Sequence, residues 1–355
     1  MENWEKSLEK CVTSPEELSG LFRVPGAPLS PVVSRYPMRI TPYYLGLIDA
    51  PGDPIWRQCV PDAAELDDLA QSPDPLDEER LSPVPGLIHR YPDRVVWIAS
   101  SACAVYCRFC MRKRGVGCAG MAPAPLDDAV AYVASRPEIR DVILSGGDPL
   151  LLSDERLDVI LTALRRIPHV EMVRIGTRVP VTLPERVTPR LVRMLKRHHP
   201  LYLNTHFNHP KEITAQSSKA CAMLAGAGIP LGNQSVLLKG VNDDPLVMRS
   251  LMQRLLAIRV RPYYIHQMDL VQGTAHFRTK LAQGVAVMEA LRGHTSGMAV
   301  PHYVIDLPGG KGKVEVSGGR MHEDGRRLLL RNYLGEEIEY PDPGVPARGD
   351  ETGDA

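Results

Sequence analysis

Three cysteines stand close together in the stretch SACAVYCRFCMRKR (101–114), namely Cys103, Cys107 and Cys110. Their C-x3-C-x2-C spacing offers three thiolates, which are the usual ligands of iron–sulfur clusters. A [4Fe–4S] cluster takes four ligands, so three cysteines leave one iron open for another molecule. Zinc fingers instead space their ligands as two separated pairs. The pattern predicts a [4Fe–4S] cluster with an open iron, with zinc held by these thiols and a histidine as the alternative.

Two glycine-rich stretches offer further cofactor contacts. SGGDPL (145–150) follows a β-branched run, and glycines at a strand end let a ligand approach the backbone. DLPGGKGKVEV (306–316) is not a Walker loop, because Lys313 is followed by Val314 rather than Ser or Thr. A lysine on a flexible glycine loop suits a Schiff base, since it must swing away when a substrate amine replaces it. A solvated surface loop is the alternative for this second stretch.

Composition narrows the class of protein. The 355 residues are 44% hydrophobic and carry 42 basic and 42 acidic side chains, which argues against a nucleic-acid binder. No apolar run approaches the roughly 18 residues that span a bilayer, and the polar start MENWEKSLEKC is unlike a signal peptide. We therefore expect a cytoplasmic protein with no membrane contact. Seven cysteines without a paired framework favour a metal site over disulfides.

The elements that must position these residues follow a regular rhythm. From residue 93 onward, β-branched runs alternate with amphipathic helical stretches, as in a parallel sheet wrapped by helices. Six such units are fewer than the eight of a closed barrel, so we predict an α/β fold with a partial (β/α)6 TIM-like barrel, and a doubly wound sheet is the alternative. The expected strands are 94–100, 141–147, 170–178, 201–207, 229–238 and 261–269.

The rest of the chain flanks this barrel. We expect an N-terminal helical and loop extension over 1–80, the barrel over 81–300 and a short C-terminal extension over 301–340 that carries the lysine loop. The Pro-, Gly- and acid-rich end, 341–355, has nothing apolar to bury and is expected to be a disordered tail.

The cysteine motif and SGGDPL together resemble the radical S-adenosylmethionine superfamily. The wider series ITPYYLGLID, LSGGDPLL, VRIGTRVPVTLP, LNTHFNHPKEIT, IPLGNQSVLLKGVND and DLPGGKGK is similar to the lysine 2,3-aminomutase family, in order from about residue 38 to about residue 335. This resemblance implies three cofactors: a [4Fe–4S] cluster, S-adenosylmethionine and pyridoxal 5′-phosphate. It also implies an isomerase that moves an amino group from C2 to C3 of an amino acid by radical chemistry.

Matching positions carry the implied cofactor roles. Lys313 corresponds to the pyridoxal lysine, seven residues after Asp306, although Lys311 replaces a usual glycine and leaves the choice of lysine open. The resemblance implies that the cluster is held by Cys103, Cys107 and Cys110. It places S-adenosylmethionine at Ser145, Gly146, Gly147, Asp148, His206 and Gln234, and the pyridoxal phosphate group at Arg90, Tyr91 and Arg94.

The expected substrate follows from charge. Arg112 matches the family's carboxylate clamp, and a guanidinium grips both carboxylate oxygens, whereas its neighbours Lys113 and Arg114 are expected to be solvated. Asp269 and Asp306 match the two aspartates that receive a side-chain ammonium. Because two facing carboxylates without a cation are strained, the pair predicts a cationic substrate. L-lysine leads and arginine is second, while glutamate is excluded.

Three functions stay open at this point. The first is a free L-lysine 2,3-aminomutase, which DLPGG with its aspartate favours. The second is the shorter relative that makes (R)-β-lysine for elongation factor P, which DLVQGTAHF and the short tail favour. The third, an iron–sulfur electron carrier, leaves the two aspartates and the lysine loop unexplained. The expected partners are an electron donor such as flavodoxin or ferredoxin and, as a homo-oligomer, other copies of the chain. The resemblance also implies a zinc held by tail cysteines together with one near GVND. Here Asp244 follows GVND and no cysteine lies beyond Cys221, so no zinc site is predicted.

Overall fold

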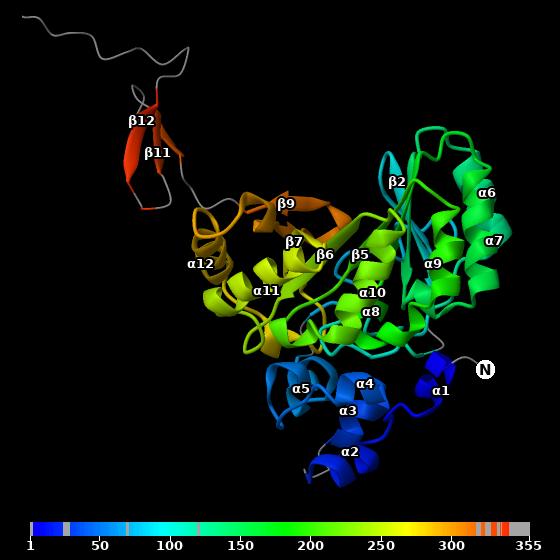
Figure 1. Ribbon diagram of the computed structural model, residues 1–355, viewed down its shortest axis with the longest axis horizontal. Helices are drawn as coiled ribbons and strands as arrows, with labels where there is room; N and C mark the ends of the chain where they lie inside the picture. Colours follow the sequence, from blue (N-terminus) through cyan, green and yellow to red (C-terminus); the bar gives the residue numbers. More distant parts are fainter. Residues whose placement is uncertain are drawn as a thin grey trace, which may run out of the picture.

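A computed structural model describes residues 3–23, 29–68, 71–118, 121–316, 321–323, 328–331, 334 and 336–340. Its centre is a curled nine-stranded sheet whose strands lie side by side in chain order (Figure 1). Strands β2 to β8 are parallel, and β1 and β9 pair antiparallel at the two edges. The strands are β1 Leu87–Tyr91, β2 Arg94–Ser100, β3 Asp141–Gly146, β4 Met172–Gly176, β5 Leu201–Thr205, β6 Leu231–Leu237, β7 Arg261–Gln267, β8 His302–Asp306 and β9 Lys313–Glu315.

The expected partial barrel is confirmed, with one addition. All six predicted strands are present as β2 to β7, and a seventh parallel strand, β8, follows them. The observed β5 and β7 end two residues earlier than expected, because the segments after them turn into the loops that carry His206 and Asp269. The sheet keeps two free edges and does not close into a full barrel.

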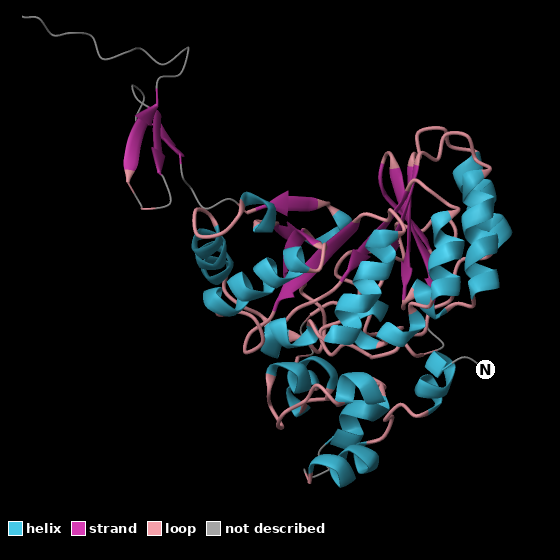
Figure 2. Ribbon diagram, in the orientation of Figure 1, coloured by secondary structure: helices cyan, strands magenta, loops and turns pink. Residues whose placement is uncertain are grey.

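Helices cover the outer face of this sheet (Figure 2). In α7, Ser153 caps the first turn by accepting from the Arg156 N–H, and the leucines at 157, 161 and 164 face the core on one stripe. In the same way, α9 buries Leu191, Met194 and Leu195 on one stripe. The helices after β2 are α6 Leu126–Ala134, α7 Asp154–Arg165, α8 Val179–Thr182, α9 Pro189–Lys196, α10 Ala215–Gly226, α11 Pro245–Ala257 and α12 Leu281–Leu291.

The N-terminal extension lies against the loop that carries the cysteines. Its backbone is joined to that loop by two hydrogen bonds, from the Tyr106 N–H to the Arg39 carbonyl (3.0 Å) and from the Arg108 N–H to the Gln58 carbonyl (2.9 Å). The helices of the extension are α1 Asn3–Glu9, α2 Pro15–Phe22, α3 Ser30–Arg35, α4 Pro42–Leu45 and α5 Pro54–Cys59.

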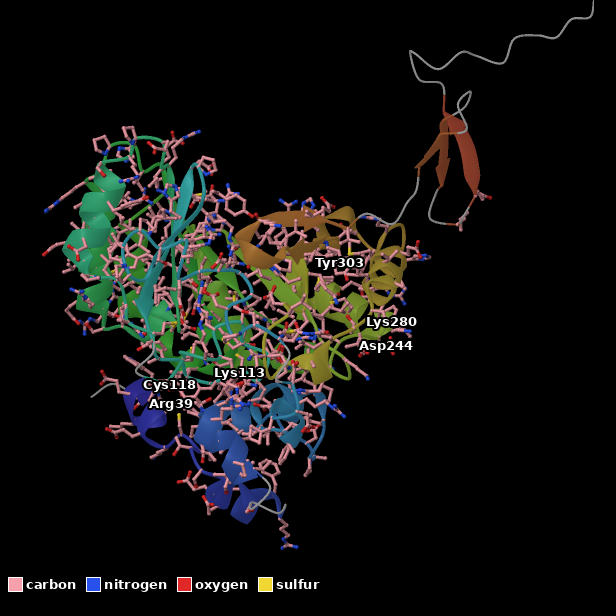
Figure 3. All side chains as sticks on the ribbon, turned by 180° about the vertical axis from the view of Figure 1, so that it is seen from behind. Arg39, Lys113, Cys118, Asp244, Lys280 and Tyr303 are labelled. Atoms are coloured by element: carbon pink, nitrogen blue, oxygen red, sulfur yellow. The ribbon has the colours of Figure 1, made fainter. Side chains whose placement is uncertain are left out.

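A buried cluster of charged side chains also joins the extension to the cysteine loop. Glu65 of the extension is fully buried and accepts from Arg108 (2.9 and 2.5 Å) and from Lys113 (2.6 Å). Lys113 is therefore buried, whereas it was expected to be solvated; only 5% of it is exposed, and it lies where the barrel meets the extension (Figure 3). Arg114 is also paired, with Asp74 and Glu79. Burial disfavours ionisation of Glu65, yet the two cations outweigh it and lower the pKa of this carboxyl.

Replacing Glu65 by glutamine is expected to lower the free energy of unfolding by about 3–5 kcal/mol, because two buried cations lose their only shared anion. Urea denaturation would measure the change. Glu171→Gln is the matched control, since its ion pair with Arg140 is exposed and contributes little. An unchanged midpoint for Glu65→Gln would contradict the role of this cluster.

The remaining described strands form a second, antiparallel sheet of β10 Met321–Glu323, β11 Leu328–Arg331 and β12 Glu337–Tyr340. The expected tail, 341–355, lies outside the described residues. Within the described ranges, no helix is both long and apolar enough to cross a bilayer.

Candidate active site

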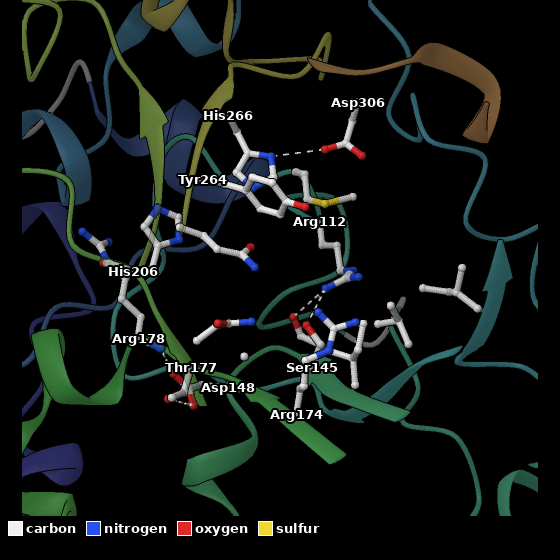
Figure 4. Close-up of a pocket in the computed structure, with 18 of the residues that line it drawn as sticks. Arg112, Ser145, Asp148, Arg174, Thr177, Arg178, His206, Tyr264, His266 and Asp306 are labelled. Carbon is white, nitrogen blue, oxygen red and sulfur yellow. Dashed lines mark hydrogen bonds and ion pairs between the residues drawn. The ribbon is translucent and has the colours of Figure 1, made fainter. Parts of the chain in front are cut away.

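A cavity of about 760 Å³ lies inside the curl of the sheet (Figure 4). Side chains of a strand alternate between its two faces, so Ile143 and Ser145 of β3 line the cavity while Val142 and Leu144 are buried in the core. The cavity brings together every residue to which the sequence assigned a role: Arg90, Tyr91, Arg94, Cys103, Cys107, Cys110, Arg112, Ser145, Gly146, Gly147, Asp148, His206, Gln234, Asp269, Asp306 and Lys313.

The three cysteines of the motif lie on the loop after β2 and face this cavity together. Burial raises the pKa of the Cys103 thiol well above its ordinary value, and burial together with Cys107 raises that of Cys110 to about 11. Across the described residues, no three His, Cys, Asp or Glu side chains converge on a single metal ion. A [4Fe–4S] cluster has a different need, one thiolate on each of three irons, and this donor set fits it. Cys118 does not line the cavity.

The glycines of SGGDPL have a structural reason beyond the one expected. A Cβ on Gly146 would lie 2.4 Å from the Ser100 carbonyl oxygen, and one on Gly147 would lie 2.4 Å from that of Ala102. Gly146 also has a φ of +119°, which L side chains rarely adopt. The absent side chains thus let β3 dock on the backbone of the cysteine loop, where the Gly147 N–H donates to Ser100 (2.6 Å).

Asp148, the last residue of SGGD, is fully engaged by the protein. Its buried carboxylate accepts from the Thr177 hydroxyl (2.6 Å) and from the N–H groups of Leu150 (3.1 Å), Arg178 (2.7 Å) and Val179 (3.1 Å). Burial raises the pKa of this carboxyl even so. With four donors in place, Asp148 fixes the turn after β4, so any contact with S-adenosylmethionine falls to its neighbours on the same loop.

His206 offers a polar atom that no described residue satisfies. Its imidazole is tilted against Phe109 with ring centroids 5.5 Å apart, and its buried Nε2 has no hydrogen-bond partner. Burial and the charge of Arg178 hold the pKa of His206 well below its ordinary value, so the ring is neutral. A buried, unpaired nitrogen at the cavity wall fits a ligand that supplies the missing partner, as the assignment to S-adenosylmethionine requires.

Lys313 and Asp306 face each other because of strand register. β8 and β9 form a tight antiparallel hairpin in which Asp306 is paired with Lys313. The Lys313 ammonium donates to both carboxylate oxygens of Asp306 (2.6 and 2.8 Å). Lys311 is exposed and does not line the cavity. The hairpin thus explains the seven-residue spacing, and only Lys313 of the two reaches the site.

The two aspartates differ sharply in their surroundings. Burial opposes ionisation of Asp306, but His266 (3.3 Å) and Lys313 hold the pKa of this carboxyl well below its usual range. Asp269 has no donor among the described residues, and burial together with the charge of Asp306 raises the pKa of Asp269 to about 7. Of these two carboxyls, Asp306 is ionised and already has a cation, whereas Asp269 has no cation partner among the described residues.

The arginines at the expected phosphate end divide into two kinds. The Arg94 guanidinium lies over the Tyr91 ring, 4.0 Å from its centroid. The Tyr91 hydroxyl accepts from the backbone N–H of Lys313 (2.9 Å). Arg90 instead points to Asp306 (3.3 Å) and the Leu76 carbonyl, so its present partner is not the one expected. Arg174, which the sequence interpretation missed, also lines the cavity, where it is paired with Asp141 (3.0 and 2.5 Å). Arg94 and Arg90 lie on the Lys313 side and fit a phosphate, since guanidinium is its natural partner.

Arg112 is held by Glu78, a residue to which no role was assigned from the sequence. Glu78 accepts from its Nε (2.8 Å) and Nη2 (2.7 Å), so the fork expected to grip a substrate carboxylate already carries one. The remaining Nη1 donates to Ser145 Oγ (3.1 Å). Burial disfavours the charge on Glu78, yet Arg112 outweighs it and lowers the pKa of this carboxyl. A substrate carboxylate would therefore meet Nη1 or displace Glu78.

Comparisons with known proteins identify the family to which this chain is similar. Residues 97–250 match the family model described as the radical SAM superfamily, and residues 288–353 match the model of lysine-2,3-aminomutase. L-lysine 2,3-aminomutase of Clostridium subterminale is 53% identical over 312 residues, covering 86% of this chain and 75% of that protein. The enzyme of the same name from Acetoanaerobium sticklandii is 51% identical over 345 residues, covering 95% and 81%.

A relative with another substrate in its name also matches. Glutamate 2,3-aminomutase of Clostridioides difficile is 43% identical over 348 residues, covering 96% of this chain and 82% of that protein. Identity at this level over most of the chain, together with the cysteine loop and the half-barrel, is sufficient to place the protein. The chain belongs to the lysine 2,3-aminomutase family of the radical S-adenosylmethionine superfamily.

Proposed function

We propose that the protein is an L-lysine 2,3-aminomutase, which exchanges the C2 amino group of L-lysine with a hydrogen on C3 to give β-lysine. The observation that carries this proposal is the carboxylate of Asp269, which lines the cavity beside Asp306 and has no cation of its own. A substrate ammonium would supply that cation. The reaction is an isomerisation, so it needs no net oxidant or reductant.

Membership of the superfamily implies a [4Fe–4S] cluster and S-adenosylmethionine, and we assign them to the cysteine loop and to the loop residues 145–147 with His206 and Gln234. Pyridoxal 5′-phosphate is assigned to Lys313, with Tyr91 and Arg94 beside it and Arg90 near. When bound, the cluster supplies the electron that cleaves S-adenosylmethionine to a radical, and the pyridoxal ring stabilises the unpaired electron while nitrogen moves.

The residues of the chain position the substrate between two charged ends. Arg112, whose Nη1 lies on Ser145, faces the carboxylate, and Asp306 lies beside His266 on the other side of the cavity (Figure 4). Asp269 lines the cavity as well, and together with Asp306 it forms an acidic end for the ammonium. Lys313 now provides the ammonium on Asp306. When that nitrogen is engaged elsewhere, the substrate ammonium replaces it, and two carboxylates share one cation in place of repelling each other.

The acidic end also ranks the alternatives. A glutamate side chain would place a third carboxylate against Asp269 and Asp306, which opposes the activity named for the Clostridioides difficile relative. Arginine and other basic amino acids remain the second candidate, because they also carry a terminal cation. Anaerobic turnover of each basic amino acid, with products separated by chirality, tests this choice; an exclusively R product would favour the elongation factor P type of aminomutase.

Replacing Asp269 by asparagine is expected to raise the KM for L-lysine at least about 30-fold, which corresponds to roughly 2 kcal/mol for losing one partner of a buried charge pair. A carboxyl with a pKa of about 7 is mostly neutral at pH 6 and mostly ionised at pH 8. The wild-type KM should therefore fall about tenfold over this range through Asp269. The variant should lose that part of the pH dependence.

Initial rates with L-lysine from pH 6 to 8 measure both effects. Asp128→Asn is the matched control, because this aspartate is exposed on α6 away from the cavity. An unchanged affinity in Asp269→Asn would refute the ammonium role and, with it, the choice of a basic substrate.

A small electron carrier of the flavodoxin or ferredoxin class is the proposed reductant, because a single electron must reach the cluster. A homo-oligomer in the cytoplasm is the proposed state of the protein. Reduction of the reconstituted cluster by either carrier, and sedimentation of the intact chain, test these points.

A further inference from the structure

Arg178 donates a hydrogen bond to the sulfur of one cluster cysteine. Its Nη1 lies 2.8 Å from Cys107 Sγ, and its Nε donates to the His206 carbonyl (3.2 Å). The guanidinium is buried and sits over the Phe109 ring at 5.3 Å. Arg178 was assigned no role from the sequence. Its positive charge lies next to the sulfur of Cys107, which is one of the three cysteines assigned to the cluster.

The N-terminal extension holds this guanidinium from the other side. Nη2 donates to Gln58 Oε1 (2.6 Å), to the Tyr44 hydroxyl (3.0 Å) and to Glu212 Oε1 (2.7 Å). Tyr44 in turn donates to Glu212 (2.7 Å). Tyr44 belongs to α4 and Gln58 to α5, so two helices of the extension fix the direction in which Arg178 points.

The backbone of Arg178 is fixed as well. Asp148 accepts from the N–H groups of Arg178 and Val179 and from the Thr177 hydroxyl, as Figure 4 shows for Arg178 and Thr177. The glycine-rich loop beside the cysteines thereby places the residue that contacts Cys107. Side chain and backbone are both anchored, which is the condition for a steady electrostatic effect on one sulfur.

We propose that Arg178 raises the reduction potential of the [4Fe–4S] cluster through Cys107, and that Glu212 limits this effect. Reduction adds one negative charge to the cluster, and a cation with an N–H directed at a ligand sulfur stabilises the reduced form. Glu212 lies on the same guanidinium and offsets part of its charge. This inference rests on the cluster that the family implies, and it is independent of lysine as substrate and of pyridoxal phosphate.

Two variants should shift the potential in opposite directions. Arg178→Met is expected to lower the midpoint so that reduction is at least about tenfold less favourable, which is about 59 mV for a one-electron couple. Glu212→Gln is expected to raise the midpoint, because the neutral amide no longer offsets the guanidinium. Arg178→Lys keeps a charge but loses the fork, so its midpoint should fall between those of Arg178→Met and the wild type.

Redox titration of the anaerobically reconstituted protein, followed by the electron paramagnetic resonance signal of the reduced cluster, measures these midpoints. Arg197→Gln removes a surface arginine that pairs with Asp158 and is the control without a shift. If Arg178→Met cannot hold a cluster, the sign of the Glu212→Gln shift decides. Equal midpoints in wild type and Glu212→Gln would overturn this inference alone, whereas a wild type without any cluster would overturn the proposed function as well.

Discussion

Cys107→Ala is expected to abolish turnover, with a loss of at least about 10⁶-fold, the lower end of enzymatic rate enhancements. Only two of the three cysteines that line the cavity would remain, and two cannot hold a [4Fe–4S] cluster with one open iron. Arg178 would also lose the sulfur to which it donates. Iron content, formation of 5′-deoxyadenosine and formation of β-lysine measure the three levels of this loss.

Cys118→Ala is the matched control for that experiment. Cys118 lies on the same loop, but its thiol does not line the cavity. Iron content and turnover should both stay near wild type. Cys107→Ala protein that retained full iron content and cleaved S-adenosylmethionine would contradict the assignment of the cluster to these three cysteines.

The barrel was predictable because its signals are local. The six expected strands are short runs that alternate with amphipathic helical stretches, and burial of both kinds of element against one another leaves little choice of fold. The strand β8 was not predicted, because a hairpin rather than a helix follows it. The same hairpin sets Lys313 opposite Asp306. The strand that was not predicted, β8, therefore explains the seven-residue spacing between these two residues.

The carboxylate partners of the basic run were not predictable in the same way. The run MRKR reads as a solvated patch when only its neighbours in sequence are considered. In the fold, Glu65 pairs with Lys113 and Glu78 with Arg112, and both glutamates come from the extension more than thirty residues upstream. No periodicity connects these segments, since tertiary docking alone brings them together.

The motif residues all line one cavity, but the motif alone did not separate ligand contacts from structural ones. Asp148 and the two glycines before it line the cavity as expected. Their side-chain and backbone geometry, however, is used to dock β3 on the cysteine loop and to fix the turn at Arg178. A sequence motif reflects the ligand contacts and the structural contacts of its residues together, and only the hydrogen bonds in the structure distinguish the two.

Lys313→Ala is expected to remove covalently bound pyridoxal phosphate and to lower turnover at least about 10²-fold, the low end of what one positioned catalytic group contributes. The methyl group that remains cannot bond to the aldehyde, and Asp306 loses the nearer of its cations. The cluster lies on another loop, so its spectrum should be unchanged. Absorbance of the bound cofactor, and mass spectrometry after borohydride reduction, measure the attachment.

Lys311→Ala separates the two lysines of the hairpin. Lys311 is exposed and makes no contact with the cavity, so its loss should leave both the attached cofactor and the rate near wild type. The reverse result, attachment lost in Lys311→Ala and kept in Lys313→Ala, would require the hairpin to slip by two residues. Such a slip would preserve which side chains face the cavity but would remove Lys313 from its place opposite Asp306, and the acidic end would lose the geometry on which a basic substrate depends.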